Sequence, residues 1–189
     1  MRNGTMEFFL KNISALCLAA LLVLPACIPG KRTGDDLTLT EAEQYVRKGD
    51  FESALESYSA ALRANPADGA VRKSYLDAVE VMEEAAGTAF DKGEFASSGR
   101  LYHVLLRNYP HFQNFTADLP FDRKYLQAKL TDCSDRLSER ALAHYRLGNL
   151  STAIALWENI LEFEPENAGV RKAINTATTQ LKSLQRKTE

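Results

Sequence analysis

Apolar residues recur every three or four positions along most of the chain beyond residue 40, and this period predicts amphipathic helices. One long stripe predicts a helix over residues 69–92, about 36 Å long at 1.5 Å per residue. Its members are Val71, Tyr75, Val79, Met82, Ala86 and Ala89. Other stripes predict a second long helix over residues 122–147 and shorter helices over residues 40–48 and 51–64, between Gly93 and Tyr109, between Gly148 and Phe163, and after Pro165. The fold class is therefore all-α.

Three stretches of the chain share one motif, in which a glycine and a proline lie 17 residues apart. Between them lie an aromatic residue or leucine, a small residue, a large aromatic residue and two small or aliphatic residues. The three copies are Gly49, Phe51, Ala54, Tyr58, Ala61, Leu62 and Pro66; Gly93, Phe95, Ser98, Tyr102, Leu105, Leu106 and Pro110; and Gly148, Leu150, Ala153, Trp157, Ile160, Leu161 and Pro165.

Each motif position has a role in a helical hairpin. A glycine in the left-handed conformation ends one helix, and Asp50 or Asn149 can then cap the next one. The small residue admits a neighbouring helix, and the aromatic residue four positions later lies on the same face. Proline ends the second helix because it has no N–H to donate. Each copy therefore predicts two antiparallel helices.

The motif resembles the second half of a tetratricopeptide repeat. The second copy departs from the family pattern, with Ser98 at the small position and Gly99 inside the predicted helix, and the turn glycines lie 44 and then 55 residues apart. We assign the extra length to the first helices and their loops. The resemblance implies a solenoid of three hairpins with elongated first helices and a C-terminal capping helix, over residues 38–189.

The first 26 residues differ from the rest and predict an export signal. Arg2 and Lys11 precede an apolar run over residues 13–24, which is too short to span a bilayer as a helix. The run ends at Ala26-Cys27, which resembles the bacterial lipobox and implies lipidation of Cys27. Residues 27–37 then form a tether. The alternatives are an ordinary signal peptide cut near Ala26 and an uncleaved anchor.

Composition excludes several function classes. The formal net charge is −2, so no basic surface for nucleic acid is expected. We find no phosphate-binding loop, metal-ligand spacing or nucleophile motif, so we expect no enzyme, metal, cofactor or small-molecule substrate. Cys133 lies on an apolar helical stripe, which favours a buried thiol over the alternative of an intermolecular disulfide.

The resemblance implies a binding surface on the first helices of the hairpins. Counting back from each turn glycine gives seven candidate residues for binding a protein partner: Glu43, Arg47, Glu80, Glu83, Asp91, Tyr145 and Arg146. The middle of this surface is acidic. An ordinary solvated helix face explains these glutamates equally well.

Residues 111–121 are the least repeat-like part of this domain, and they contain Phe112 and Phe115. These rings either form a partner-binding loop or cover the end of the solenoid core. Because exposed aromatic clusters are unusual, we favour the second interpretation.

These observations together predict a non-catalytic adaptor or scaffold lipoprotein of the bacterial cell envelope. The residue after the cysteine, Ile28, implies the outer membrane, with the domain facing the periplasm. The expected partner is a protein, in the assembly or secretion of an envelope complex. The alternatives are a glycan- or peptidoglycan-binding lipoprotein that uses the loop aromatics, and a structural oligomer built through the long helices.

Overall fold

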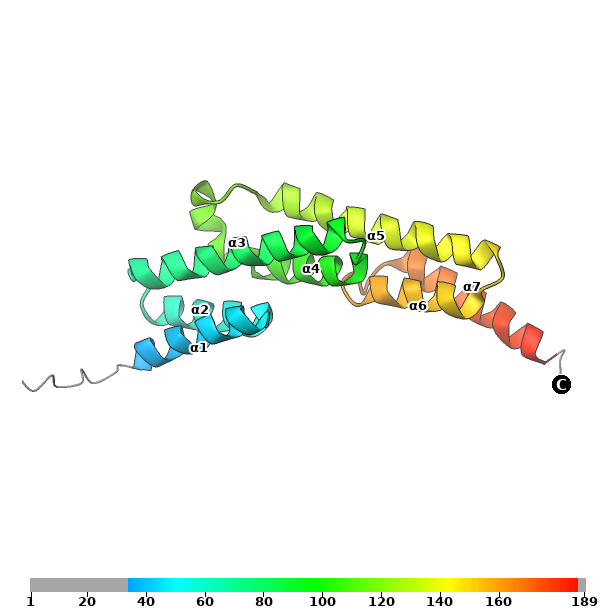
Figure 1. Cartoon of the computed structure of the whole chain (residues 1–189), viewed down its shortest axis with the longest axis horizontal. Coiled ribbons are helices and arrows are strands. Elements are labelled where there is room, and N and C mark those ends of the chain that lie inside the picture. Colours follow the sequence, from blue (N-terminus) through cyan, green and yellow to red (C-terminus); the bar gives the residue numbers. More distant parts are fainter. Residues whose placement is uncertain (1–33, 187–189) are drawn as a thin grey trace, which may run out of the picture. The chain divides into compact units, whose positions relative to one another are not determined.

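A computed structural model describes residues 34–186, with side chains from residue 40 onward. The expected export signal, Cys27 and residues 27–33 of the expected tether lie outside these residues. The described part contains seven α-helices, one 3-10 helix and no strand (Figure 1). The elements are α1 (Gly34–Lys48), α2 (Phe51–Ala64), α3 (Gly69–Asp91), α4 (Phe95–Phe112), η1 (Gln113–Asp118), α5 (Arg123–Arg146), α6 (Leu150–Leu161) and α7 (Ala168–Gln185).

The helices form three successive hairpins and a final helix, as the motif predicted. Helix α1 packs on α2, α3 on α4, and α5 on α6. Each second helix also packs on the first helix of the following hairpin, and α7 packs on α6 in that same place. The second helices α2, α4 and α6 contact one another weakly. This is the stacking of a helical repeat solenoid, so the predicted fold class is confirmed.

The three turn glycines end their helices in the same way. Gly49, Gly93 and Gly148 have φ values of 74°, 76° and 78°, in the left-handed region. In the first turn, the Gly49 N–H donates to the Val46 carbonyl and the Asp50 N–H donates to the Tyr45 carbonyl. The other two turns repeat both bonds. These bonds define the Schellman motif, which satisfies the last carbonyls of a helix.

Capping side chains begin several helices. Asp50 accepts from the Ser53 N–H, as the motif predicted. Asn149 was expected to act likewise, but it occupies the N-cap position without a side-chain bond. Asp68, Asp122 and Asn167 accept N–H groups at the starts of α3, α5 and α7. Helix α1 begins at Gly34 instead of near Thr40, so it includes four residues that we had placed in the tether.

The small motif positions are fully buried, and the second copy uses its unusual residues for packing. Ser98 donates from its hydroxyl to the Ala86 carbonyl of α3 at 2.8 Å. A Cβ atom at Gly99 would lie 2.6 Å from the ring of Phe163, which is itself buried. The absence of a side chain at Gly99 therefore lets α4 approach the end of α6. This departure from the family pattern is required by the packing of α4 against Phe163.

The prediction that the second copy's proline ends its helix is wrong. Helix α4 continues through Pro110 to Phe112. The reason is that the Phe112 ring is fully buried, edge-on to Tyr75 at 6.1 Å and to Tyr109 at 5.1 Å between ring centroids. Burial of a large aromatic ring offsets the loss of one helical hydrogen bond. The extra length of this hairpin thus lies in both of its helices.

The apolar stripes of the long helices are covered inside the chain. Val71, Tyr75 and Val79 of α3 and Leu126 and Leu130 of α5 all belong to one buried cluster. These stripes therefore give no reason to expect an oligomer.

Cys133 is fully buried in the same cluster, as predicted, 3.3 Å from the Ser98 hydroxyl. Burial raises the pKa of its thiol, which keeps it protonated and unreactive.

Candidate functional site

A groove on the first helices lies between α1 and α3. It encloses about 240 Å³. Its lining residues come from α1, α2 and α3: Glu43, Val46, Arg47, Tyr58, Ser74, Asp77, Ala78 and Val81. We call these residues the α1–α3 groove. A second hollow of about 420 Å³ shares Val81 with it and follows α3 toward the Gly93 turn, where Lys92 and Glu94 lie.

The groove combines an apolar contact with polar groups that can hold a ligand. Val81 is 44% exposed, which is high for a valine on a packed helix. Tyr58 is buried except at the groove, and its hydroxyl forms no hydrogen bond with any other residue from 40 to 186. Burial, with repulsion from Glu43 and Asp77, raises the pKa of Tyr58 to about 12. Its hydroxyl is therefore a neutral donor at physiological pH.

Charges of both signs border the groove. Glu43 and Asp77 supply two carboxylates and Arg47 one guanidinium. Asp77 is paired with Lys73 of its own helix at 2.6 Å, and both side chains are largely exposed. An exposed pair of this kind contributes little and can be exchanged for a ligand's charge. The groove thus suits a polypeptide that carries both polar and apolar groups.

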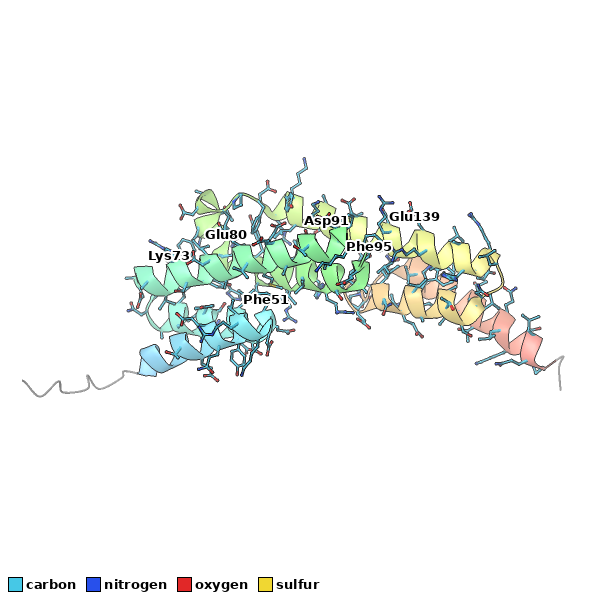
Figure 2. All side chains as sticks on the ribbon, in the orientation of Figure 1. Phe51, Lys73, Glu80, Asp91, Phe95 and Glu139 are labelled. Carbon is cyan, nitrogen blue, oxygen red and sulfur yellow. The ribbon has the colours of Figure 1, made fainter. Side chains whose placement is uncertain are left out.

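The structure brings only two of the seven predicted binding residues, Glu43 and Arg47, into this groove. Glu80 and Asp91 lie exposed along α3, as Figure 2 shows, but outside the groove. Arg146 is exposed at the end of α5. Tyr145 packs against Trp157 at 5.8 Å between ring centroids, and this contact with the core motif position occupies one of its faces.

Glu83 holds helices together. Its carboxylate accepts from the Tyr125 hydroxyl of α5 at 2.8 Å and from the Tyr102 hydroxyl of α4 at 3.4 Å. Burial, and then the bond to Glu83, raises the pKa of Tyr125 to about 12. The residues of α3 that face α5 and those that face α1 therefore lie on two different sides of the helix. Counting back from Gly93 led to Glu83, which lies on the side that faces α5.

Four groove residues on α3 were missed by the sequence reasoning: Ser74, Asp77, Ala78 and Val81. They recur at three and four residues, so a helical face was visible in the sequence. The available signal was Val81, an apolar residue that lies off the buried stripe of Val79 and Met82.

The loop aromatics are part of the core, as the favoured interpretation held. Phe112 is fully buried and cannot stack on a ligand. Phe115 is half-buried, and the Arg72 guanidinium lies over its ring at 5.3 Å from the centroid.

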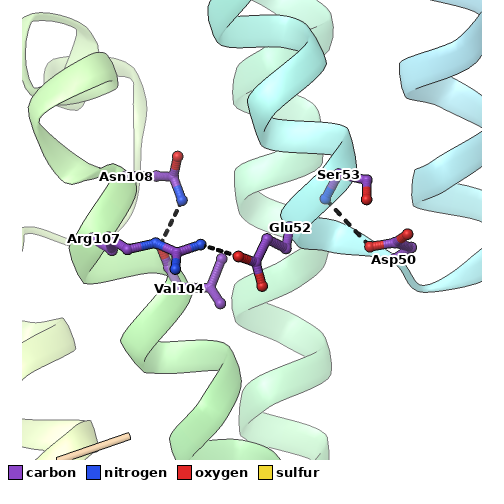
Figure 3. A network of polar contacts seen from close by, with 6 residues as sticks. All are labelled: Asp50, Glu52, Ser53, Val104, Arg107 and Asn108. Atoms are coloured by element: carbon purple, nitrogen blue, oxygen red, sulfur yellow. Dashed lines mark hydrogen bonds and ion pairs between the residues drawn. The ribbon is translucent and has the colours of Figure 1, made fainter.

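Exposed ion pairs join the second helices and so fix the spacing of the hairpins. Arg107 of α4 pairs with Glu52 of α2 (Figure 3). Arg100 of α4 pairs at 2.5 Å with Glu162, at the end of α6. All four side chains are about half exposed. Each pair therefore contributes only about 0–1 kcal/mol to the free energy of unfolding.

Two properties of the described residues bear on other kinds of site. No group of three or more His, Cys, Asp or Glu residues from 40 to 186 is placed to hold a metal ion. None of the helices over residues 34–186 combines the length and the apolar character needed to cross a bilayer.

Comparison with known proteins identifies the repeats. The profile of the tetratricopeptide repeat family matches residues 39–111, which include helices α1 to α4 except the start of α1 and the last residue of α4. No curated protein matches the chain. The third hairpin lies beyond the match but repeats the same turn and the same buried small and aromatic positions. Residues 39–111 are therefore tetratricopeptide repeats, and proteins that contain such repeats are generally non-catalytic and commonly bind other proteins.

Proposed function

We propose that this protein is a non-catalytic adaptor or scaffold of the bacterial cell envelope that binds a protein partner in the α1–α3 groove. The observation that carries the proposal is the groove itself, which lies within the matched repeats. Its exposed Val81 and the unpaired Tyr58 hydroxyl are the kind of apolar anchor and fixed donor that protein interfaces use.

The location rests on the N-terminal sequence alone. Residues 1–26 have the charge and apolar order of an export signal, and Ala26-Cys27 resembles a lipobox. We propose that lipid on Cys27 anchors the protein in the outer membrane, facing the periplasm. A lipidated N-terminus would hold the adaptor at the membrane while its partner is assembled or exported.

The two alternatives receive less support. A glycan site would need aromatic rings open to solvent, whereas Phe112 is fully buried and Phe115 is covered on one face by Arg72. A structural oligomer would need uncovered stripes on α3 and α5, whereas those stripes are buried.

The test is a crosslinking pull-down from intact cells with three variants of the full chain. Val81→Glu places a charge at an apolar lining residue of the groove. Leu184→Glu is the matched control, because Leu184 is 49% exposed on α7, far along the chain. Cys27→Ala removes the proposed lipidation site.

We expect one envelope protein to be captured by the native chain and by Leu184→Glu, and to be lost with Val81→Glu. Loss with Cys27→Ala as well supports the anchor. Equal capture by Val81→Glu would show that the groove does not bind the partner. Capture that is unchanged by Cys27→Ala would show that the anchor is not needed.

A further inference from the structure

A second cavity lies at the other end of the hairpins, where α2 ends and η1 begins. It encloses about 410 Å³ and shares no residue with the α1–α3 groove. One wall comes from α2 and the turn after it, and the other from the end of α4 and from η1. Its lining residues, which we call the α2–η1 pocket, are Ser59, Leu62, Arg63, Pro66, Pro110, His111, Asn114 and Phe115.

The pocket exists because α4 does not end at its motif proline. The helix continues to Phe112 and leads directly into η1, which brings Asn114 and Phe115 opposite Leu62 and Pro66. Of the three hairpins, only the second has this continuation. The pocket is therefore a feature of this chain's irregular repeat.

The floor and the apolar walls of the pocket are preformed. The buried Ser59 hydroxyl donates to the buried Tyr75 hydroxyl at 3.2 Å, which fixes both groups. Leu62 and Phe115 are half-buried and face the cavity from opposite walls. A side chain that enters between them would gain apolar contact without rearranging the core.

The charge at the pocket is basic and uncompensated. Arg63 is exposed and forms no ion pair with any residue from 40 to 186. Arg72 likewise forms no ion pair with any residue from 40 to 186, and its guanidinium lies over the Phe115 ring. No acidic residue lines the cavity, and nearby Asp68 is engaged in capping α3 through the N–H groups of Ala70 and Val71. In contrast, Arg107 and Arg100 of α4 both have carboxylate partners.

We propose that the α2–η1 pocket binds an acidic segment of a protein, with one bulky apolar side chain next to an aspartate or glutamate. The apolar side chain lies between Leu62 and Phe115. The carboxylate pairs with Arg63 and Arg72, and Asn114 and His111 supply further polar contacts at the rim. Guanidinium groups favour this ligand because they match a carboxylate in charge and in geometry. The proposal goes beyond the function proposed above, since the pocket lies apart from the α1–α3 groove.

The test is fluorescence anisotropy with the full chain in detergent micelles, which keep the apolar residues 13–24 in solution. The probe is a labelled peptide that alternates aspartate with leucine and phenylalanine. A second peptide carries asparagine in place of every aspartate. The binding variant is Arg63→Gln with Arg72→Gln, and the matched control is Arg136→Gln with Arg186→Gln, an exposed arginine of α5 and one directly after α7.

We expect the aspartate peptide to bind the native chain and the control alike, and to bind the Arg63→Gln, Arg72→Gln variant roughly tenfold more weakly. The asparagine peptide should bind the native chain as weakly as the aspartate peptide binds the Arg63→Gln, Arg72→Gln variant. Asn114→Trp, which fills the cavity without changing charge, should also abolish binding. Failure of the aspartate peptide to bind, equal binding of both peptides, or equal binding by the variant would overturn the proposal. The Val81→Glu variant should bind the peptide normally, which separates this result from the groove test.

Discussion

Two connections in this chain begin with the same motif proline and develop differently. After α2, the chain leaves the helix at Asn65 and passes Pro66, and Asp68 caps α3. After Tyr109, the chain remains helical through Pro110 to Phe112. The residue two positions beyond the proline is Asp68 in one case and Phe112 in the other. The side chain at this position accounts for whether the helix ends or continues. Asp68 caps the next helix through the Val71 N–H, whereas the Phe112 ring is buried in the core.

The third connection agrees with this rule. Two positions beyond Pro165 lies Asn167, which accepts the Val170 N–H and begins α7. A polar capping residue at this position therefore gives a short turn, and a large apolar residue extends the helix. The extension at α4 also forms the α2–η1 pocket, so one residue type at one position changes the surface of the domain.

The largest effect is expected from removing the aromatic ring that extends α4. Phe112→Ala should lower the free energy of unfolding by about 3–5 kcal/mol, because the ring is fully buried against Tyr75 and Tyr109. Urea unfolding followed by circular dichroism measures this change. Phe115→Ala is the control and should lower stability much less, because Phe115 is only half-buried. Equal losses would show that Phe112 has no special role.

The two prolines offer a direct comparison. Pro110→Ala should raise the free energy of unfolding by about 1–3 kcal/mol, because alanine restores an N–H donor inside α4. Pro66→Ala should give no gain, because Pro66 lies outside any helix. The same urea titration tests both variants. A gain at Pro66 that matched the gain at Pro110 would contradict the account of α4.

Glycines on α3 and α4 should respond to alanine substitution with changes of opposite sign in stability. Gly99→Ala should lower stability by about 1–2 kcal/mol, since its Cβ atom would lie 2.6 Å from the Phe163 ring. Gly87→Ala should raise stability by about 0.5–1 kcal/mol, because its Cβ atom would meet nothing nearer than 3.8 Å. Thermal unfolding of both variants checks the signs. Stabilisation by Gly99→Ala would mean that α4 and Phe163 are not in close contact.

The Glu83 contact predicts a smaller effect at the junction of α3 and α5. Tyr125→Phe should lower stability by about 1 kcal/mol, because the Glu83 carboxylate loses its shorter hydrogen bond. Tyr45→Phe is a suitable control, since Tyr45 bonds only Glu41 in its own helix at 3.2 Å. Chemical unfolding should show almost no change for the control. A Tyr125→Phe variant of native stability would show that the bond between Tyr125 and Glu83 does not stabilise the fold.

The raised tyrosine pKa values predict an effect that is absent at neutral pH. Tyr58 and Tyr125 have pKa values of about 12 in the fold and an ordinary value of 10.0. Between these pH values the unfolded chain releases protons that the folded chain keeps, so stability falls as pH rises. Urea unfolding at pH 9 and pH 11 should show this fall, and a Tyr58→Phe, Tyr125→Phe variant should show less of it. Equal falls would contradict the assignment.

Much of the fold followed from the sequence. Three local features sufficed. The turn glycines predicted the ends of the first helices, the small and aromatic residues predicted the packing face of the second helices, and the apolar period predicted the helices themselves. The end of α4 did not follow, because burial of Phe112 depends on Tyr75, 37 residues earlier, and no local pattern records that contact. The packing role of Gly99 could not be predicted for the same reason, since its partner Phe163 lies in another hairpin.

The site was only partly predictable. Glu43 and Arg47 lie in the groove because α1 follows the family register back from its turn glycine. On α3, the same register led to Glu83, whose carboxylate bonds Tyr102 and Tyr125. The sequence could not show which side of this long helix faces α1. Val81 lies off the buried stripe and was the one signal that the sequence offered, whereas the position of Tyr58 in the groove emerged only once the helices were placed.

The most direct test of protein binding in the α1–α3 groove is photocrosslinking in living cells. A photoreactive amino acid at position 81 would line the groove, and one at position 184 would lie at the exposed end of α7. We expect position 81 to give one discrete crosslinked protein that position 184 does not give. Crosslinks from position 184 alone, or the same products from both positions, would contradict a partner seated between α1 and α3.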